Sequence, residues 1–511
     1  MPASDKRLQQ LALLGGAFFI AICGLIYELL AGTLSSYLLG DSVYQFSLVI
    51  GLFMSSMGVG AWASRFIHKD LPAAFVRLQL LIGLFGGLVA PVLFFAFAVL
   101  DSYTPLLFAF VVLLGAMLGI EIPLIIRILK THFTLRMNVS NVFTLDYIGA
   151  LFAALLFPLV LVPQLGLMQT GFVTAMLNVL VGGLALYVFR HEIRAARRLG
   201  LVAAGVFLLL AAGFWQAGGY TRLMENRLYQ DEIIHAQDTP YQRLIVTRRA
   251  ERIRFYINGA LQFDSFDEYR YHESLVHPAV GATHNPENVL ILGGGDGLAA
   301  RELLKYPGIE RITLVDLDPA VTRLFSGNPL LRRLNRDSLN DPRVSIHNRD
   351  AWRFLEQSGQ LYDLVVIDLP DPNNPGLSRL YSAAFYRLLK QHVSQAGVIV
   401  TQATSPLYSR KAFWCIEKTL GESTDGERWH TLPSHVYVPS FGEWGFVMAS
   451  RVKPKPVLKT AARPLRYLDA TTLRTLYLFP ADMNAIDVEP NSLSSHRLLK
   501  YYQQGWEAWY E

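Results

Sequence analysis

The sequence LILGGGDGLAARELLKY, residues 290–306, joins a short apolar run to an amphipathic segment through a glycine-rich turn. The apolar run predicts a buried strand, and LAARELLKY predicts an amphipathic helix. At the end of a strand, Gly293, Gly294 and Gly295 permit backbone angles and a close approach of a ligand that side chains would prevent. The stretch therefore predicts a ligand-binding loop between a strand and a helix.

Further apolar runs follow this loop and alternate with helical patterns such as residues 378–390. The runs are RITLVDLD (311–318), RVSIHNRD (343–350), YDLVVIDLPD (362–371) and AGVIVTQA (396–403). Apolar strands separated by helices predict a Rossmann-like, doubly wound α/β domain of the class I methyltransferase type, with ligands at the carboxyl ends of its strands. GEWGFVMAS (442–450) predicts a late antiparallel strand.

Acidic residues recur at the ends of these predicted strands. They are Asp296, Asp316, Asp350, Asp368 and Asp371. Asp316 follows the glycines by about twenty residues, where a carboxylate accepts bonds from ribose hydroxyls, and Asp350 falls within reach of an adenine. Asp296 disfavours a pyrophosphate in the loop and suits a cation. Aspartate is also a common cap and turn former, but its occurrence at successive strand ends favours a ligand with a nucleoside end and a positive end.

The first 217 residues are much more apolar than the rest of the chain. They hold seven runs long enough to cross a bilayer, which needs about 20 apolar residues each. The runs lie near 10–37, 44–65, 74–99, 105–128, 144–163, 168–189 and 200–217.

Basic residues mark alternate loops of this region. They are Lys6, Arg7, Arg65, Lys69, Arg127, Lys130, Arg136, Arg190, Arg194, Arg197 and Arg198. The loops around Asp41, Asp101 and Gln164 lack Lys and Arg. The positive-inside rule then places the N-terminus in the cytoplasm, and seven spans place residues 218–511 on the opposite side.

Two glutamates lie inside the predicted spans. Glu28 and Glu121 lie within spans, where an ionisable group is costly and marks a polar site unless it reaches an interface or pairs with a neighbour such as Arg127. Cys23 and Cys415 lie far apart in unlike contexts, which supports neither a disulfide framework nor a cysteine metal site. The net charge of +5 comes mostly from residues that flank spans, so nucleic-acid binding is not predicted.

Changes of composition and of hydrophobic pattern along the chain predict four parts. They are a membrane domain (1–217), a linker with a small β-hairpin subdomain (218–285), the Rossmann-like catalytic domain (286–450) and a C-terminal extension (451–511). In the second part, Asn258-Gly259 predicts a tight hairpin turn between strands of alternating polarity.

Residues 238–450 resemble the spermidine synthase (polyamine aminopropyltransferase) family, in the branch that carries a multi-span N-terminal region. The resemblance rests on TPYQ, INGALQFDSFDEYRYHESLVHP, VLILGGGDG, LVDLD, RDAWRFL and VVIDLPDPNNP, in this order. It implies transfer of an aminopropyl group from decarboxylated S-adenosylmethionine to putrescine, which gives spermidine and methylthioadenosine without a cofactor or a metal. It also implies a multi-pass protein of the cell (inner) membrane, with the bilayer as a partner. The same resemblance places decarboxylated S-adenosylmethionine in the cytoplasm, against the outward placement from charge, so the side of the catalytic domain is left open.

The resemblance also implies roles for single residues. Asp368 and Tyr271 would position and deprotonate the amine. The amine contacts would be Gln242, His272, Asp296 and Asp371. The nucleoside contacts would be Gly293, Gly294, Gly295, Asp316, Asp350, Ala351 and Pro375.

This chain departs from the family pattern at several positions. Asp316 replaces a Glu, Ala351 replaces a Gly, and Asn374 replaces a Gly, a change expected to stiffen its loop. In the late strand, no residue matches cleanly a tyrosine that helps to seat the amine; Pro439 or Ser440 falls near its place. These departures bear on which amine is accepted more than on the type of reaction.

Two other functions are compatible with parts of the sequence. The glycine loop alone also suits a methyltransferase that uses S-adenosylmethionine, although the acidic pocket disfavours it. Glu28 and Glu121 also suit a polyamine transporter whose synthase-like half senses substrate. A homo-oligomer is left open.

Overall fold

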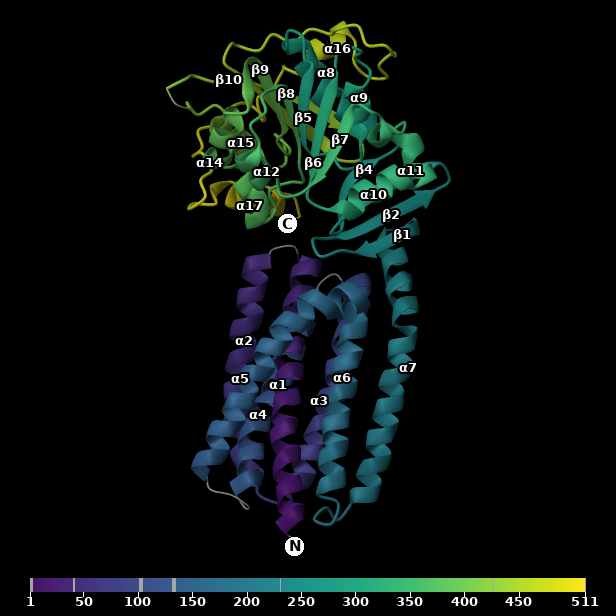
Figure 1. Cartoon of the computed structure of the whole chain (residues 1–511), viewed down its shortest axis with the longest axis vertical. Helices are drawn as coiled ribbons and strands as arrows, with labels where there is room; N and C mark the ends of the chain where they lie inside the picture. The colour runs from purple at the N-terminus through teal and green to yellow at the C-terminus, as the bar shows by residue number, and fades with distance from the viewer. Residues whose placement is uncertain are drawn as a thin grey trace. The chain divides into compact units, whose positions relative to one another are not determined.

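The computed structural model of this chain describes residues 3–39, 42–100, 104–130, 135–229, 231–424 and 426–510. It consists of two compact units, Met1–Ile233 and Ile234–Glu511 (Figure 1). The first unit is helical, and the second combines two β-sheets with helices. The predicted loop positions Asp41 and Asp101 lie outside the described residues.

The helical unit is built from seven α-helices in its described part. They are α1 (Ala3–Leu39), α2 (Ser42–Ala63), α3 (Leu71–Val99), α4 (Thr104–Lys130), α5 (Leu135–Leu156), α6 (Val162–Val188) and α7 (Ala196–Tyr229). By length and composition alone, six described stretches suit a membrane crossing. One of them, Val139–Val188, has 50 residues and contains two of the predicted runs, 144–163 and 168–189.

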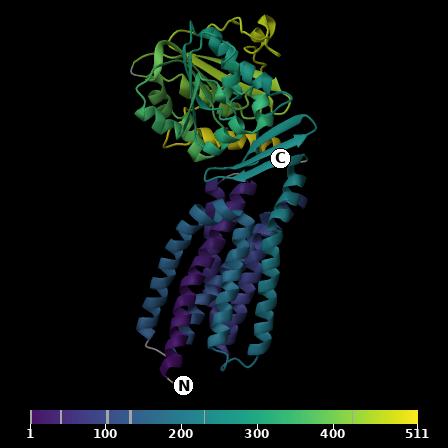
Figure 2. The same cartoon turned by 45° about the vertical axis from the view of Figure 1, so that its right-hand side comes forward.

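This long stretch is not one straight helix. A π-helical turn at Phe157–Leu161 follows α5, and Gly166 has non-helical backbone angles (φ 73°, ψ 174°) near the start of α6. Figures 1 and 2 show α5 and α6 as separate rods that run in opposite directions. The chain therefore traverses this unit once before and once after the bend at Gly166, as the two apolar runs predict.

Buried polar groups occur inside the helical unit. Glu121 on α4 is 1% exposed, and its Oε1 accepts a hydrogen bond of 2.5 Å from Gln79 on α3. Arg127 donates instead to main-chain oxygens, among them that of Ser64 at 2.9 Å. The partner of Glu121 is thus an amide, and the pairing with Arg127 considered from the sequence is wrong.

The α/β unit begins with a small four-stranded sheet in the order β1-β2-β3-β4. Its strands are β1 (Glu232–Asp238), β2 (Arg243–Arg249), β3 (Arg252–Ile257) and β4 (Ala260–Asp264). The predicted hairpin turn joins β3 to β4, where Asn258 (φ 49°) and Gly259 (φ 82°) both have positive φ, as a two-residue type I′ turn requires. Helix α7 runs past the expected end at residue 217, because residues 220–229 contain good helix formers and no proline.

The large sheet has seven strands in the order β10-β11-β9-β8-β5-β6-β7. They are β5 (Asn288–Gly293), β6 (Arg311–Asp316), β7 (Val344–Asn348), β8 (Tyr362–Asp368), β9 (Val393–Gln402), β10 (His430–Val438) and β11 (Gly442–Ser450). Strands β7, β6, β5, β8 and β9 are parallel, and β11 pairs antiparallel with β9, so the predicted mostly parallel sheet with a late antiparallel strand is confirmed.

Strand order sets the position of the ligand site. The chain proceeds from β5 through β6 to β7, and then returns to the other side of β5 as β8. Such a reversal opens a crevice at the carboxyl ends of the two central strands, here β5 and β8. The glycine loop follows β5 directly, and β8 ends at Asp368.

The alternating side chains of the central strands fill two separate cores. Val289 and Ile291 face the core that includes α8 (Glu268–Ala282), α9 (Leu298–Leu303) and α10 (Pro319–Gly327). Leu290 and Leu292 face the core that includes α12 (Ala351–Gln357), α14 (Ala383–Lys390) and α15 (Arg410–Leu420). Helices therefore cover both faces of the sheet, as its continuous apolar runs predict.

The C-terminal extension packs against this fold and does not form a separate domain. Leu473 of α16 (Ala470–Thr475) lies in the first core, and Leu498 of α17 (Arg497–Tyr510) lies in the second. Short elements complete the unit: α11 (Pro329–Leu334), the 3-10 turn η3 (Ser338–Asn340), α13 (Pro375–Ser378) and the 3-10 turn η4 (Arg379–Tyr381).

Candidate active site

The glycine loop and Asp368 meet at the crevice between β5 and β8. Gly293 pairs directly with Asp368 in the parallel register, and the Gly294 N–H donates to the Asp368 main-chain oxygen at 3.0 Å. Gly293 has φ 83°, and a Cβ there would lie 2.2 Å from that oxygen. A Cβ at Gly295 would lie 2.5 Å from an Asp316 carboxylate oxygen. Side chains at these positions would displace both acids.

A cavity of about 410 Å³ opens at this point. Most of the residues predicted for the site line it: Gln242, Tyr271, His272, Gly293, Gly294, Gly295, Asp296, Asp316, Asp350, Ala351, Asp368 and Asp371. Pro375 is not among the lining residues, although Asn374 and Gly376 on either side of it are. The cavity is therefore formed by segments that lie far apart in sequence, from Tyr241 to Tyr502.

Asp368 and Tyr271 are in direct contact. The Tyr271 hydroxyl donates a hydrogen bond of 2.8 Å to Asp368 Oδ1. Tyr271 lies on α8 and is 8% exposed, with its ring against Phe446 of β11. Burial, and then the charge of Asp368, raises the pKa of Tyr271 well above its ordinary value. Tyr271 therefore stays protonated and acts as a donor that orients the Asp368 carboxylate.

A connected set of buried charged side chains includes His272, which lines the cavity. Both Arg301 Nη atoms donate to the Glu268 carboxylate, at 2.9 and 2.8 Å, and His272 Nδ1 lies 2.8 Å from Glu268 Oε2. Burial alone would lower the pKa of His272, but the hydrogen bond and charge of Glu268 raise it to about 9. Burial would raise the pKa of Glu268, but His272 and Arg301 lower it to about 2. His272 is therefore a cation at neutral pH.

Asp296 lies at the start of α9, where its Oδ1 accepts from the Leu298 N–H at 2.9 Å. Burial raises the pKa of this carboxyl to about 6. The positive charge of His272 opposes the increase, and the negative charge of Asp368 adds to it. At neutral pH Asp296 is mostly ionised, and it gains protons readily as the pH falls.

Asp371 follows β8 and is also buried. Burial raises its pKa to about 6, and hydrogen bonds from Tyr502, Gln402 and Thr404 oppose the increase. The Thr404 hydroxyl lies 3.3 Å from Asp371 Oδ2. Within the described residues, Asp371 Oδ1 has no hydrogen-bond partner. This oxygen is itself buried, and its capacity to accept a hydrogen bond is unused.

The two carboxylates on the predicted nucleoside side hold the loops in place. Asp316 accepts from two main-chain N–H groups, at 3.1 and 2.9 Å, and burial raises its pKa to about 6. Asp350 caps α12 by accepting from the Arg353 N–H at 3.1 Å, and it forms an ion pair with Arg379. Both acids lie at the cavity wall, and their contacts to a ribose and an adenine stay predictions.

Gln242 reaches the cavity from the small sheet. The turn before β2 is closed by Thr239, whose N–H and hydroxyl both donate to the Gln242 main-chain oxygen at 2.9 Å. The Thr239 hydroxyl also lies 2.8 Å from Asp318, directly beyond β6. This contact fixes the small sheet beside the strand ends and brings Gln242 to the site.

Asn374 caps a short helix in its loop, and the expected stiffening of that loop stays a prediction. Its φ is −147°, in the extended region, so the position has no need of glycine. Its Oδ1 accepts from the Leu377 N–H at 2.9 Å and caps α13. The substitution therefore starts a short helix in the loop after β8.

Several lining residues were not predicted from the sequence. They are Tyr241, Arg379, Gln402, Phe441, Trp444 and Tyr502, among others. Tyr502 is the most distant of them, because α17 begins more than 120 residues after Asp371. The aromatic, amphipathic sequence YYQQGWEAWY (501–510) signals a packed helix, but nothing in its spacing indicates which surface it covers.

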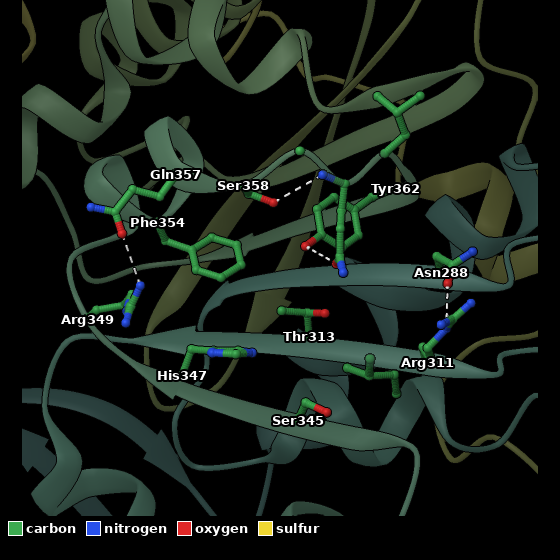
Figure 3. Close-up of a pocket in the computed structure, with 14 residues that line it drawn as sticks. Asn288, Arg311, Thr313, Ser345, His347, Arg349, Phe354, Gln357, Ser358 and Tyr362 are labelled. Atoms are coloured by element: carbon green, nitrogen blue, oxygen red, sulfur yellow. Dashed lines mark hydrogen bonds between the residues drawn. The ribbon is translucent and has the colours of Figure 1, made fainter.

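A second cavity, of about 540 Å³, lies over β6 and β7 beneath α12 (Figure 3). Figure 3 shows Thr313, Ser345 and His347 along the strands, with Phe354 above them. The described residues that line it include no Asp or Glu. It therefore offers no carboxylate as a counter-charge for a cation, and the smaller cavity is the candidate active site.

Metal-ligating side chains do not gather in the described part of the chain, where no three His, Cys, Asp or Glu are placed to hold one ion. Cys23 and Cys415 are both buried and unpaired, and they belong to different units. The candidate site thus presents carboxylates, one buried imidazolium and hydroxyl groups.

Comparisons with known proteins match most of the chain. The model of the spermine/spermidine synthase domain matches residues 268–459. A polyamine aminopropyltransferase of Leptospira interrogans is 46% identical over 97% of this chain and 99% of its own length. Polyamine aminopropyltransferase 2 of Ralstonia nicotianae is 46% identical over 96% of this chain and 97% of its own. A polyamine aminopropyltransferase of Oceanobacillus iheyensis is 38% identical over 99% of both chains.

A solved structure is also similar to part of the chain. The crystal structure of spermidine synthase from Thermotoga maritima covers 48% of this chain and 84% of its own, with 22% identity and a TM-score of 0.44.

Proposed function

Because the chain belongs to the polyamine aminopropyltransferase family, we propose that the 410 Å³ cavity at the ends of β5 and β8 binds both substrates of that reaction. The family resemblance noted in the sequence is confirmed, and the chain is an aminopropyltransferase. Decarboxylated S-adenosylmethionine is consumed as a substrate and is not a resident cofactor. The observation that carries the assignment of the site is Asp368, held by Tyr271 beside the glycine loop.

The reaction needs an amine that has lost a proton. Putrescine is a dication at neutral pH, so one nitrogen must be deprotonated before it attacks. That nitrogen then forms a bond to the carbon next to the sulfonium, and the carbon–sulfur bond breaks. The electron pair returns to sulfur, methylthioadenosine leaves, and the proton passes to Asp368 as general base. Alignment of the two bound reactants supplies the rest of the reduction in the activation barrier, a contribution that reaches about 7–11 kcal/mol in favourable intramolecular cases.

The charges of the cavity suit this pair of substrates. Asp296 and Asp371 are buried carboxylates near the proposed base, and they would pair with the ammonium groups. His272 is itself a cation and would repel an ammonium group, so its role differs from the direct amine contact implied by the resemblance. We propose that the role of His272 is to act on Asp296. Its positive charge lowers the pKa of Asp296, so that Asp296 stays ionised at neutral pH.

The nucleoside would lie on the other side of Asp368. Gly293 to Gly295 leave room for close approach to the main chain, and Asp316 at the end of β6 would face the ribose. Asp350 and Ala351 at the start of α12 would face the adenine. A role for Pro375 beside the thioadenosine stays a prediction, since it lies in the same loop but not in the cavity wall.

One experiment separates this function from methyl transfer. The purified full-length protein is incubated with putrescine and either decarboxylated S-adenosylmethionine or S-adenosylmethionine, and the products are identified by mass spectrometry. We expect spermidine and methylthioadenosine from the decarboxylated form alone. Methylated putrescine with S-adenosylhomocysteine would instead identify a methyltransferase.

We also propose that the helical unit is a multi-pass domain of the cell membrane. The described stretches of sufficient length and hydropathy support this proposal, as does the bend at Gly166, which divides the longest of them. Seven traverses and the alternating basic loops favour a catalytic unit outside the cytoplasm. The supply of decarboxylated S-adenosylmethionine, which the resemblance places in the cytoplasm, favours the opposite side.

Reporter fusions after Glu511 decide between the two sides. Alkaline phosphatase is active outside the cytoplasm, whereas a fluorescent protein that matures only in the cytoplasm reports the inner side. Phosphatase activity without fluorescence supports the outward orientation. Fluorescence without phosphatase activity would show that the positive-inside rule fails for this chain or that one apolar run does not cross.

A further inference from the structure

The cavity wall includes a residue from beyond the part of the chain that matches the family domain. That match ends at residue 459, whereas Tyr502 lies on α17 and lines the cavity. Tyr502 and Asp371 line the same cavity, and an interaction with the Tyr502 side chain lowers the pKa of Asp371. A C-terminal helix outside the matched domain therefore contributes to the acidic end of the site.

The extension is tied to the loop that carries Asp371. Asn491, which is 1% exposed, donates through Nδ2 to the Ser378 main-chain oxygen at 2.9 Å. Its own main-chain oxygen accepts from the Ala383 N–H at 2.9 Å, and its N–H donates to Thr419 Oγ1 at 2.9 Å. One buried asparagine thus joins the extension to the segment after β8 and to α15.

Helix α17 lies in close contact with the turn that precedes α15. Ser409 Oγ is 3.3 Å from the main-chain oxygen of Tyr501 and 3.4 Å from that of Tyr502. A Cβ at Gly505 would lie 2.5 Å from Ser409 Oγ, so glycine permits this approach. The Trp506 ring also packs on Tyr408, with centroids 5.3 Å apart. The position of Tyr502 is therefore fixed by packing along the helix.

One of the two carboxylate oxygens of Asp371 has no hydrogen-bond partner among the described residues. Thr404 contacts Oδ2, and Oδ1 has no hydrogen-bond partner in the described part of the chain. A buried carboxylate with a free oxygen, beside an aromatic ring, suits an ammonium group, which gains a charge-assisted hydrogen bond and a cation–π contact. The hydroxyl of Tyr502 restricts rotation of the carboxylate and stabilises its ionised form.

We propose that Tyr502 is a positioning residue for the acceptor amine: it orients Asp371 so that the free carboxylate oxygen receives an ammonium group of the polyamine. This proposal rests on the proposed function of the cavity. It assigns acceptor recognition in part to α17, which lies beyond the matched family domain.

The test compares Tyr502→Phe with Tyr501→Phe in the full-length protein. Tyr501 is the adjacent tyrosine of α17, and its hydroxyl accepts from the Glu489 N–H at 3.5 Å and does not line the cavity. We expect Tyr502→Phe to raise the KM for putrescine about 10-fold, the size expected for loss of a hydrogen bond to a charged group. The KM for decarboxylated S-adenosylmethionine and the unfolding midpoint should stay within error of wild type, and Tyr501→Phe should change none of the three.

A pH profile and a double-mutant cycle separate positioning from packing. The donated hydrogen bond lowers the pKa of Asp371, so the acid limb of kcat/KM for putrescine should move to higher pH in Tyr502→Phe. Tyr271 and Tyr381 also face Asp371, but their pKa values are raised well above 10, so they stay neutral in this range. In an Asp371→Asn background, Tyr502→Phe should change the putrescine KM less than 2-fold, because coupled residues are not additive.

Three outcomes would overturn the proposal. They are a wild-type putrescine KM in Tyr502→Phe, an equal rise in the KM of both substrates, and a full 10-fold effect in the Asp371→Asn background. Failure of the proposed function has a different signature, since wild-type protein would then form no spermidine from decarboxylated S-adenosylmethionine and putrescine.

Discussion

Glu268→Gln should destabilise the α/β unit and impair amine binding together. Glu268 is 5% exposed, and its carboxylate is shared by Arg301 and His272. The substitution keeps the shape of the side chain and removes its charge. Two neighbouring buried cations then lose their common counter-charge, and breaking a buried pair in this way costs about 3–5 kcal/mol.

The pKa of His272 gives a second measure of the same effect. The difference between the ordinary histidine value of 6.5 and about 9 corresponds to about 3 kcal/mol of stability. Because the pKa is raised in the folded state, this contribution is complete below pH 6.5 and is lost as the pH rises through about 9. The difference between wild type and Glu268→Gln should therefore be largest near pH 6 and become smaller towards pH 9, where the Arg301 contribution remains.

Thermal unfolding and steady-state kinetics measure both consequences. A loss of about 3 kcal/mol should lower the unfolding midpoint by roughly 6–12 °C in a unit of this size. In the variant, burial favours the neutral form of His272, and the charges of Asp368 and Asp296 are left to oppose it, so Asp296 loses part of the charge that lowers its pKa. The KM for putrescine at pH 7 should rise accordingly.

Glu251→Gln is the control, because Glu251 is 96% exposed and pairs with Arg248 at 3.6 Å on the surface. An exposed pair contributes about 0–1 kcal/mol, so we expect no measurable change. An unfolding midpoint within about 2 °C of wild type for Glu268→Gln, with an unchanged KM for putrescine, would refute the reasoning.

Four further predictions concern the cavity and the division of the chain. The kcat/KM for putrescine should fall as the pH drops through about 6, because Asp296 and Asp371 gain protons there; a flat profile from pH 8 to 5 would contradict this. Gly294→Val should abolish binding of the nucleoside substrate, because Gly294 has φ 60° and a Cβ there would lie 3.1 Å from Ile291 and 3.3 Å from the Asp368 carboxylate. Asp296→Asn should chiefly weaken binding of the amine substrate, and separate titrations with the amine and with the nucleoside substrate distinguish the two effects. A fragment of residues 231–511 should retain activity, because that unit contains the entire cavity; a folded but inactive fragment would show that the helical unit contributes.

The sequence was sufficient to predict the central part of the site because parallel strands place their ends at one edge. Gly293 and Asp368 are 75 residues apart, yet they are direct register partners in neighbouring strands. Apolar runs followed by glycine or aspartate therefore identify the same edge of the sheet from the order of residues alone. The antiparallel β11 and the Asn258-Gly259 turn were predictable for the same local reasons.

The remaining parts depend on tertiary packing, which spacing does not encode. Tyr502 reaches the cavity only because Asn491 and Gly505 fix the extension on the loop after β8 and on α15. The charge of His272 depends on Glu268, one helical turn away, and on burial that removes water from both. A sequence shows that the two residues are neighbours on a helix, but it does not show that they are buried together.

The central claim is that Asp368 accepts the proton of the attacking amine, and Asp368→Asn tests it most directly. The measurement is the single-turnover rate of spermidine formation from decarboxylated S-adenosylmethionine and putrescine. Asp363→Asn, at the opposite end of β8, is the control for changes to the strand itself. The account predicts a loss of about 100-fold or more for Asp368→Asn, in line with the contribution of a general base, and a near wild-type rate for Asp363→Asn. A near wild-type rate for Asp368→Asn, in protein that binds both substrates, would remove Asp368 from the mechanism.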